Sequence, residues 1–199
     1  MKYVKILGLL AVAAAALMAF AGSASATSLT SPTGTLYTGA IASTAEGHAV
    51  LDNPIAKIEC ASSVSGEKIE SHGAGVTAKG QIKTLTFGNP VGECTNNWHV
   101  TVVTAGELEI HWKAAGEGTL TSSKATVEST RFGITCRYAT SGTSIGTLTD
   151  SHKTGATATL DISASIPFHS GSGLCGSGAT AWTGSYIVNT PDKLYIDQN

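Results

Sequence analysis

The stretch E-L-E-I-H-W, from Glu107 to Trp112, decides the fold because its apolar and polar residues alternate without a break. Successive side chains of a β-strand point to opposite faces, so the three apolar residues are expected to share the core face. The polar residues Glu107, Glu109 and His111 are expected to lie together on the opposite face, in contact with solvent. The stretch therefore predicts a half-buried strand.

Two other stretches alternate in the same way, Gln81 to Phe87 and Ala156 to Ala164. In the first, the phase changes once between Ile82 and Leu85, which predicts a β-bulge. Thr, Val and Ile are frequent in such runs, and Gly, Asn and Pro bound them. Past residue 26, no window of ten residues shows the 3.6-residue period of an amphipathic helix. We therefore expect an all-β chain, folded as an antiparallel sandwich or a barrel-like structure.

The composition excludes several classes of protein. Of the 199 residues, 42% are hydrophobic and only 13% are charged, and the formal net charge is −2. Such sparse charge argues against a nucleic-acid-binding protein built on a basic face. The apolar fraction is too high for a disordered acidic chain. We expect no nucleic-acid partner.

The first 26 residues have the pattern of a secretory signal peptide. A short positive start is followed by an apolar run from Ile6 to Ala21, whose 16 residues are too few for a membrane span of about 20. Small residues then end in an A-x-A cleavage site at Ala26. We expect residues 27–199 to form one exported, extracellular β domain without a membrane span.

The chain has four cysteines, at Cys60, Cys94, Cys136 and Cys175. An even number of cysteines in an exported chain favours disulfides over free thiols. None of the spacings fits the C-x2-4-C pattern of a zinc site. Spacing alone leaves all three possible pairings open.

An internal repeat suggests which cysteines pair. Ile58–Gly66 and Ile134–Gly142 both read I-x-C-x-x-x-x-S-G. A Gly-Thr-Leu segment precedes each cysteine, at Gly34–Leu36 and Gly118–Leu120, and further landmarks follow in the same order. Near-constant offsets between matching landmarks are typical of a duplicated unit, here of about 80 residues. The two units would span roughly residues 32–112 and 116–197.

If the two units are equivalent, the simplest pairing is Cys60 with Cys94 and Cys136 with Cys175. Each bond would close a loop of 35 to 40 residues and stabilise the fold by about 3–4 kcal/mol in the loop-entropy model. A chain with few charges and many polar strands is expected to need this contribution.

Trp98 and Trp182 occupy matching positions in the two units. Their simplest interpretation is a core aromatic ring beside a disulfide, and the alternative is a platform on which a sugar ring stacks. Trp112 has no counterpart in the second unit. It is therefore the tryptophan expected to be exposed, and it is the candidate ligand-binding residue.

Possible catalytic groups are few. Gly142–Gly146 matches the G-x-S-x-G motif with Ser144 at its centre, but no helix follows to form a nucleophile elbow, so we expect a turn. Glu107, Glu109 and His111 share a strand face and could bind a cation or act as acid and base. We interpret them as a solvated outer face. We expect no catalytic residue, no metal site and no cofactor.

The chain resembles a group of uncharacterised secreted β-rich proteins of actinobacteria. The resemblance rests on its leader, its C-x5-G and G-x-C segments and the closing W-x-G-x-Y-x-V from Trp182 to Val188. It covers most of the mature chain and implies no site. The first unit, with Ser65-Gly66, Leu85 to Phe87 and Cys94, is more loosely similar to exported activators of alkane oxidation. That similarity implies a surface-associated, non-catalytic protein.

We therefore expect a secreted, non-enzymatic protein of the extracellular space or cell surface, with a structural, adhesion or interaction role. Its partners would be a cell-wall glycan or another surface protein, and exposed strand edges would allow self-association. The alternative is a carbohydrate-binding module that uses Trp112. A secreted hydrolase that uses Ser144 or the Glu107 face is a third hypothesis.

Overall fold

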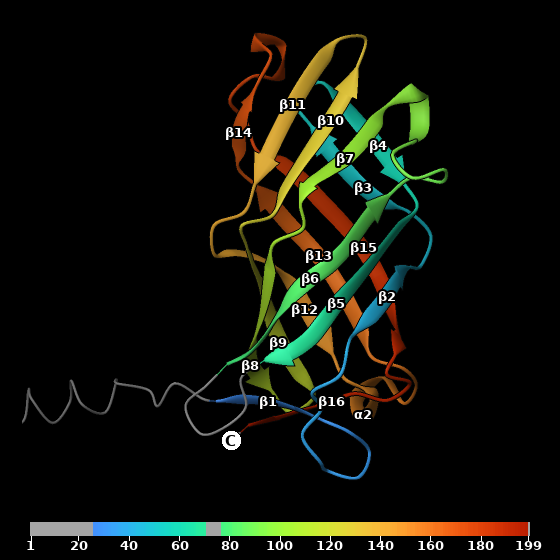
Figure 1. Cartoon of the computed structure of the whole chain (residues 1–199), viewed down its shortest axis with the longest axis vertical. Helices are drawn as coiled ribbons and strands as arrows, with labels where there is room; N and C mark the ends of the chain where they lie inside the picture. Colours follow the sequence, from blue (N-terminus) through green and yellow to red (C-terminus); the bar gives the residue numbers. More distant parts are fainter. Residues whose placement is uncertain (1–25, 71–76, 199) are drawn as a thin grey trace, which may run out of the picture.

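The computed structural model describes residues 26–70 and 77–198 (Figure 1). The predicted leader, apart from Ala26, lies outside these residues. The strands are β1 (Thr27–Thr30), β2 (Ala42–Ala45), β3 (Ala49–Asn53), β4 (Ala56–Cys60), β5 (Ser62–Glu70), β6 (Ala78–Phe87), β7 (His99–Thr104), β8 (Glu107–Ala114), β9 (Glu117–Ser123), β10 (Thr126–Arg131), β11 (Ile134–Ala139), β12 (Thr143–Thr149), β13 (Thr159–Ile166), β14 (Phe168–Gly171), β15 (Thr180–Thr190) and β16 (Tyr195–Gln198). The helical segments are α2 (Ser151–Thr154) and the 3-10 turns η1 (Thr95–Asn97) and η2 (Gly173–Cys175).

Eight of these strands close into an antiparallel barrel, and they follow one another around it in chain order: β2, β5, β6, β8, β9, β12, β13 and β15. The ring closes because β15 pairs with both β13 and β2. The expected all-β class is confirmed, and the architecture is a barrel. A barrel of eight strands has an interior just wide enough for side chains or for one small ligand.

A second tier extends the barrel at one end, the upper end in Figure 1. There β7, β10, β11 and β14 form a four-stranded sheet, while β3 and β4 continue the sheet beside β15. The chain passes from the four-stranded sheet of β7 to the barrel strand β8 at Gly106. This position depends on glycine, because its φ is +79° and a Cβ there would lie 2.3 Å from the Ser123 carbonyl oxygen. Among the described strands of this tier, β4, β7 and β14 lie at the edges of their sheets.

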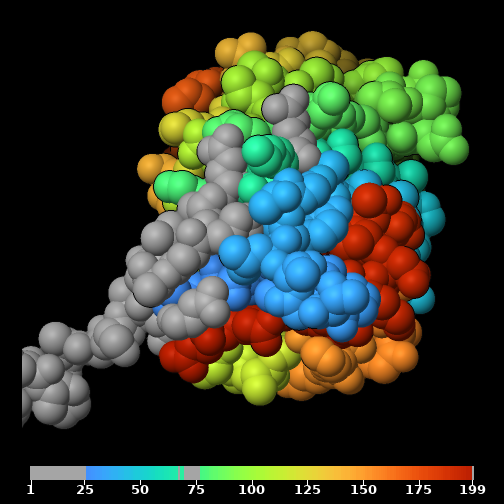
Figure 2. Space-filling model, turned by 60° about the horizontal axis from the view of Figure 1, so that its bottom comes forward, coloured from blue at the N-terminus to red at the C-terminus, as the bar shows by residue number. Residues whose placement is uncertain are grey.

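The lower end of the barrel is closed by a two-stranded ribbon of β1 and β16. Figure 2 shows the first and last described segments of the chain side by side across this end. Leu29 of β1, Ile196 of β16 and Leu194 just before β16 are buried and belong to the hydrophobic core. The core therefore continues from the barrel into its lower closure.

The alternating stretches form strands, with one correction. The stretch from Glu107 lies in β8, and the one from Gln81 lies in β6. Pairing of β6 with β5 shifts so that Ser65 faces Thr84 and Gly66 faces Ile82, which leaves Lys83 as the extra residue of the predicted bulge. The third stretch was predicted from residue 156, but β13 starts only at Thr159, because residues 155–157 form a bend after α2. The Thr154 hydroxyl holds this bend, since it donates to the Thr157 carbonyl and accepts the Ala156 N–H.

All four cysteines are paired, Cys60 with Cys94 and Cys136 with Cys175, as the equivalence of the two units predicted. The first bond joins the β4–β5 segment to the connection between β6 and β7. The second joins β11 to η2, which connects β14 and β15. Both disulfides thus lie in the upper tier and tie a strand to a loop.

The duplication itself stays a prediction. The two disulfides occupy comparable places in the barrel topology, but other landmarks do not. Gly34–Leu36 lies in the loop before β2, whereas its supposed counterpart Gly118–Leu120 lies inside β9.

Candidate functional site

The inner faces of the upper strands enclose a cavity, lined mainly by apolar side chains such as Leu85, Phe87 and Val127. Its volume of about 30 Å³ is room for about two or three water molecules. Buried polar residues also line it, among them Asn53, Ser129, Tyr138 and Thr180. We call this space the upper cavity.

Each of these four residues has a buried polar atom with no hydrogen-bond partner among the described residues: Asn53 Nδ2, Ser129 Oγ, Tyr138 Oη and Thr180 Oγ1. The orientation of the Asn53 amide is fixed, because its Oδ1 accepts the backbone N–H groups of Ile55 and Ala56 at 3.0 and 2.9 Å. Buried polar groups are rarely left unpaired. Several unpaired polar atoms around one cavity indicate a binding site for polar molecules.

Tyr138 stands on β11 with its ring edge-on to Phe168, at 6.0 Å between ring centroids. Burial raises the pKa of its phenol above the ordinary value of 10. The phenol therefore stays protonated at neutral pH and can donate a hydrogen bond into the upper cavity.

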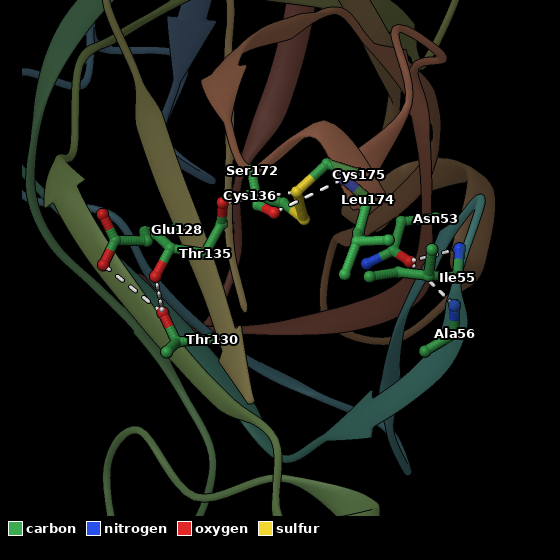
Figure 3. The surroundings of a disulfide bond; sticks show 10 residues. All are labelled: Asn53, Ile55, Ala56, Glu128, Thr130, Thr135, Cys136, Ser172, Leu174 and Cys175. Carbon is green, nitrogen blue, oxygen red and sulfur yellow. Dashed lines mark hydrogen bonds between the residues drawn. A yellow bond between two sulfur atoms is a disulfide. The ribbon is translucent and has the colours of Figure 1, made fainter. Parts of the chain in front are cut away.

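A second pocket lies at the upper end, where three connections come together: the β3–β4 turn, the β10–β11 turn and η2. We call it the mouth pocket. It has a volume of about 270 Å³ and is lined by Ile55, Trp98, Arg131, Phe132, Ile134 and Leu174. Figure 3 shows Leu174 beside Asn53 and Ile55, next to the Cys136–Cys175 disulfide.

The mouth pocket exposes large apolar side chains at loop tips. Phe132 is 82% exposed, Leu174 64% and Ile55 40%. Phe132 and Gly133 form the two-residue turn between β10 and β11, and both have positive φ, 50° and 76°. Asn-Gly is the favoured pair for such a turn, and a bulky residue at positive φ is strained. The turn therefore carries an apolar ring at a conformational cost.

Of the residues that the structure describes, Arg131 is the only charged one that lines the mouth pocket. Its guanidinium carbon lies 4.5 Å from the centroid of the Phe132 ring and 6.0 Å from that of Trp98. Its Nε is buried and has no hydrogen-bond partner in the described part of the chain. This part of the pocket therefore combines a cation with two aromatic faces.

The lower end holds the predicted candidate Trp112. This tryptophan is half-buried, while Trp98 and Trp182 are 4% and 9% exposed and belong to the core, as their matching positions predicted. Trp112 lines a surface groove of about 550 Å³ with Asp150, His152 and Asp197 among its polar neighbours. We call it the lower groove.

The polar groups of the lower groove already have partners. The Asp150 carboxylate accepts the backbone N–H groups of His152 and Lys153 at 3.0 Å and that of Ile196 at 3.2 Å. Asp197 Oδ2 accepts the Thr30 hydroxyl at 2.6 Å. The ring of His152 stacks on Tyr195, at 3.7 Å between centroids. These carboxylates hold the lower closure together.

The other predicted groups lie on outer faces. Glu107 accepts hydrogen bonds from Lys124 Nζ at 2.7 Å and Gln81 Nε2 at 2.8 Å, and these bonds lower the pKa of its carboxyl. Glu109 Oε2 lies 3.5 Å from His111 Nε2, and both side chains are exposed.

Ser144 is exposed on β12, so the expected turn at this residue is wrong: the strand begins at Thr143. The turn lies just before it, around Gly142, whose φ is +66°. Ser144 pairs with Thr121 of β9 within the barrel sheet.

In the part of the chain that the structure describes, no three His, Cys, Asp or Glu side chains gather where they could hold a metal ion. Within the same residues, no helix has the length and hydropathy needed to cross a membrane. No known family, curated protein or solved structure matches this chain at a significant level.

Proposed function

We propose that this chain is an exported, non-enzymatic binding protein that holds a small, mostly apolar molecule in its mouth pocket. The leader pattern and the two disulfides support an extracellular location, because disulfides persist in oxidising compartments. The resemblance to secreted actinobacterial β-proteins agrees with this location.

One observation carries the proposal: three large apolar side chains from three separate loops are exposed around one pocket. They are Ile55, Phe132 and Leu174. Exposed apolar patches mark binding surfaces, and loops held by a rigid scaffold are where binding residues gather.

The predicted catalytic groups support a binding role over a hydrolytic one. Ser144 lies on an exposed strand face, and Glu107 is bonded to Lys124 and Gln81. General acid–base catalysis needs such groups within hydrogen-bond reach of a bound substrate. Neither residue lines the mouth pocket.

The test is titration of the oxidised protein with N-phenyl-1-naphthylamine, a neutral dye that fluoresces in apolar pockets. We expect saturable binding that Phe132→Asn and Leu174→Ser each weaken by about tenfold, because a buried side chain of this size contributes about 1.5–3 kcal/mol. Asparagine suits the positive φ at residue 132, so the turn is retained. Val91→Ser is the matched control, since Val91 is 73% exposed and lies outside the pocket. Absence of saturation, or equal weakening by Val91→Ser, contradicts the proposal.

A carbohydrate-binding role is the second candidate. It is favoured by the position of Trp112, the most exposed of the three tryptophans, in a groove with hydrogen-bonding neighbours. Pull-down on insoluble glycans and cell walls tests it, with Trp112→Ala as the variant and Trp112→Phe as the control that keeps an aromatic ring. Loss of binding in Trp112→Ala alone supports a glycan site. Wall binding that survives this change supports a surface protein held by other contacts, such as the edge strands β4 and β14.

A further inference from the structure

We infer that the ligand of the mouth pocket is an anionic amphiphile, a small anion such as a carboxylate attached to an apolar body, and that Arg131 binds the anion. The inference rests on the proposed function, because it names the class of molecule that the same pocket takes.

Arg131 faces the inside of the molecule. Side chains alternate along β10, so Arg131 shares its face with Ser129 and Val127, which line the upper cavity. The acidic residue nearest in sequence, Glu128, lies on the opposite face. Glu128 is paired there with Arg137, at 2.6 Å between Oε2 and Nε.

Among the side chains that the structure describes, no carboxylate lies within ion-pair distance of the Arg131 guanidinium. Its Nε is buried, and the rings of Phe132 and Trp98 are its close neighbours. A partly desolvated cation is only partly stabilised by aromatic faces. An incoming carboxylate would accept charge-assisted hydrogen bonds from this guanidinium.

The remaining walls select an apolar body attached to that anion. Ile55, Ile134 and Leu174 surround the cation with aliphatic surface. An inorganic anion would leave this surface exposed to water. A flat membrane or protein surface would contact the exposed loop tips but would not enter the pocket between them. A volume of about 270 Å³ is near the lower limit of ligand pockets, which indicates a small molecule.

Displacement of the neutral dye by probes with equal chain length tests the inference. The probes are octanoate, 1-octanol and octylammonium, with inorganic phosphate as the anion that lacks an apolar body. We expect octanoate to displace the dye at a concentration at least tenfold below that of octanol, with octylammonium weakest and phosphate without effect. High salt should reduce the advantage of octanoate, because ion pairs near the surface are screened.

Arg131→Gln should remove the preference, so that octanoate and octanol become equal, while the neutral dye still binds and shows that the pocket is folded. Arg131→Lys should keep part of the preference, because it keeps the charge but loses the forked geometry. Arg137→Gln is the matched control, since Arg137 lies on the outer face of the neighbouring strand, and it should change nothing.

The outcomes separate the two proposals. If octanol matches octanoate and Arg131→Gln has no effect, the anionic class is wrong while the binding function stands. Displacement by phosphate alone, or binding to anionic lipid vesicles without binding of free octanoate, also overturns it. If the dye itself does not bind, the proposed function has failed.

Discussion

Tyr138 and Tyr186 are two buried tyrosines whose hydroxyl groups differ in their surroundings. Tyr186 Oη donates to Ser62 Oγ at 2.9 Å, whereas Tyr138 Oη has no hydrogen-bond partner within residues 26–70 and 77–198. Burial raises the pKa of both phenols above 10, and the Ser62 hydrogen bond partly opposes this for Tyr186. An unpaired buried hydroxyl costs stability, while a bonded one contributes to it.

We therefore predict opposite effects of removing these hydroxyls. Tyr138→Phe should leave the free energy of unfolding unchanged or raise it by up to about 1 kcal/mol, and Tyr186→Phe should lower it by about 1 kcal/mol. Urea unfolding at pH 8, followed by circular dichroism, measures both. Equal destabilisation by the two variants would show that the Tyr138 hydroxyl is bonded in solution.

The same two tyrosines predict a loss of stability at alkaline pH. Above pH 10, the unfolded chain releases phenol protons that the folded chain still holds, so the free energy of unfolding falls as pH rises toward the raised folded-state values. Urea unfolding at pH 8 and pH 10.5 should show this fall. The fall should be smaller in Tyr138→Phe and Tyr186→Phe. If both variants lose as much free energy of unfolding between pH 8 and pH 10.5 as the unchanged protein, the two phenols are not its cause.

At the scale of elements, the short helix α2 matters more than its four residues suggest. Asp150 caps it through two backbone N–H groups and also accepts the N–H of Ile196 in β16. Ser151 adds a second link, because its N–H donates to the Leu194 carbonyl at 2.9 Å. One carboxylate thus connects α2 to the ribbon that closes the barrel.

We predict that Asp150→Ala lowers the free energy of unfolding by about 2–3 kcal/mol, because it removes a helix cap and leaves a buried N–H of β16 unpaired. Asp150→Asn should cost roughly half as much, since asparagine caps helices well but keeps a single acceptor oxygen. Denaturant unfolding measures both. If the two variants are equally destabilised, the loss reflects the charge and not the capping geometry.

In the whole molecule, the barrel and the mouth pocket are held together by different means. Eight strands close the barrel by backbone pairing, whereas the mouth pocket depends on loops that the two disulfides tie to strands. The Cys136–Cys175 bond fixes η2, and with it Leu174, beside the β3–β4 turn (Figure 3). The disulfides therefore hold the mouth pocket in shape.

Cys136→Ala combined with Cys175→Ala should lower the free energy of unfolding by about 3–4 kcal/mol in the loop-entropy model. Hydrogen exchange should show lost protection in β11, β14 and η2, with protection retained in β8, β9 and β12. Dye binding at the mouth pocket should weaken in the same double variant. Loss of protection spread evenly over the barrel would contradict this division between the barrel and the upper tier.

The sequence by itself determined the features that depend on neighbouring residues. Alternation with a period of two predicted the strand at Glu107, the core side of β8 and the bulge near Lys83, since each follows from which way successive side chains point. The similarity of the two halves predicted both disulfides. The burial of Trp98 and Trp182 followed from their matching positions.

Only the tertiary structure decided the closure of the barrel and the mouth pocket. Closure depends on β15 pairing with β2, whose residues are far apart in sequence, and local alternation holds no information on such pairing. For the same reason Ile55, Phe132 and Leu174 could not be grouped from the sequence, although a phenylalanine in a Phe-Gly turn was a visible signal. Side-chain direction is a local property, whereas a pocket is built from long-range contacts.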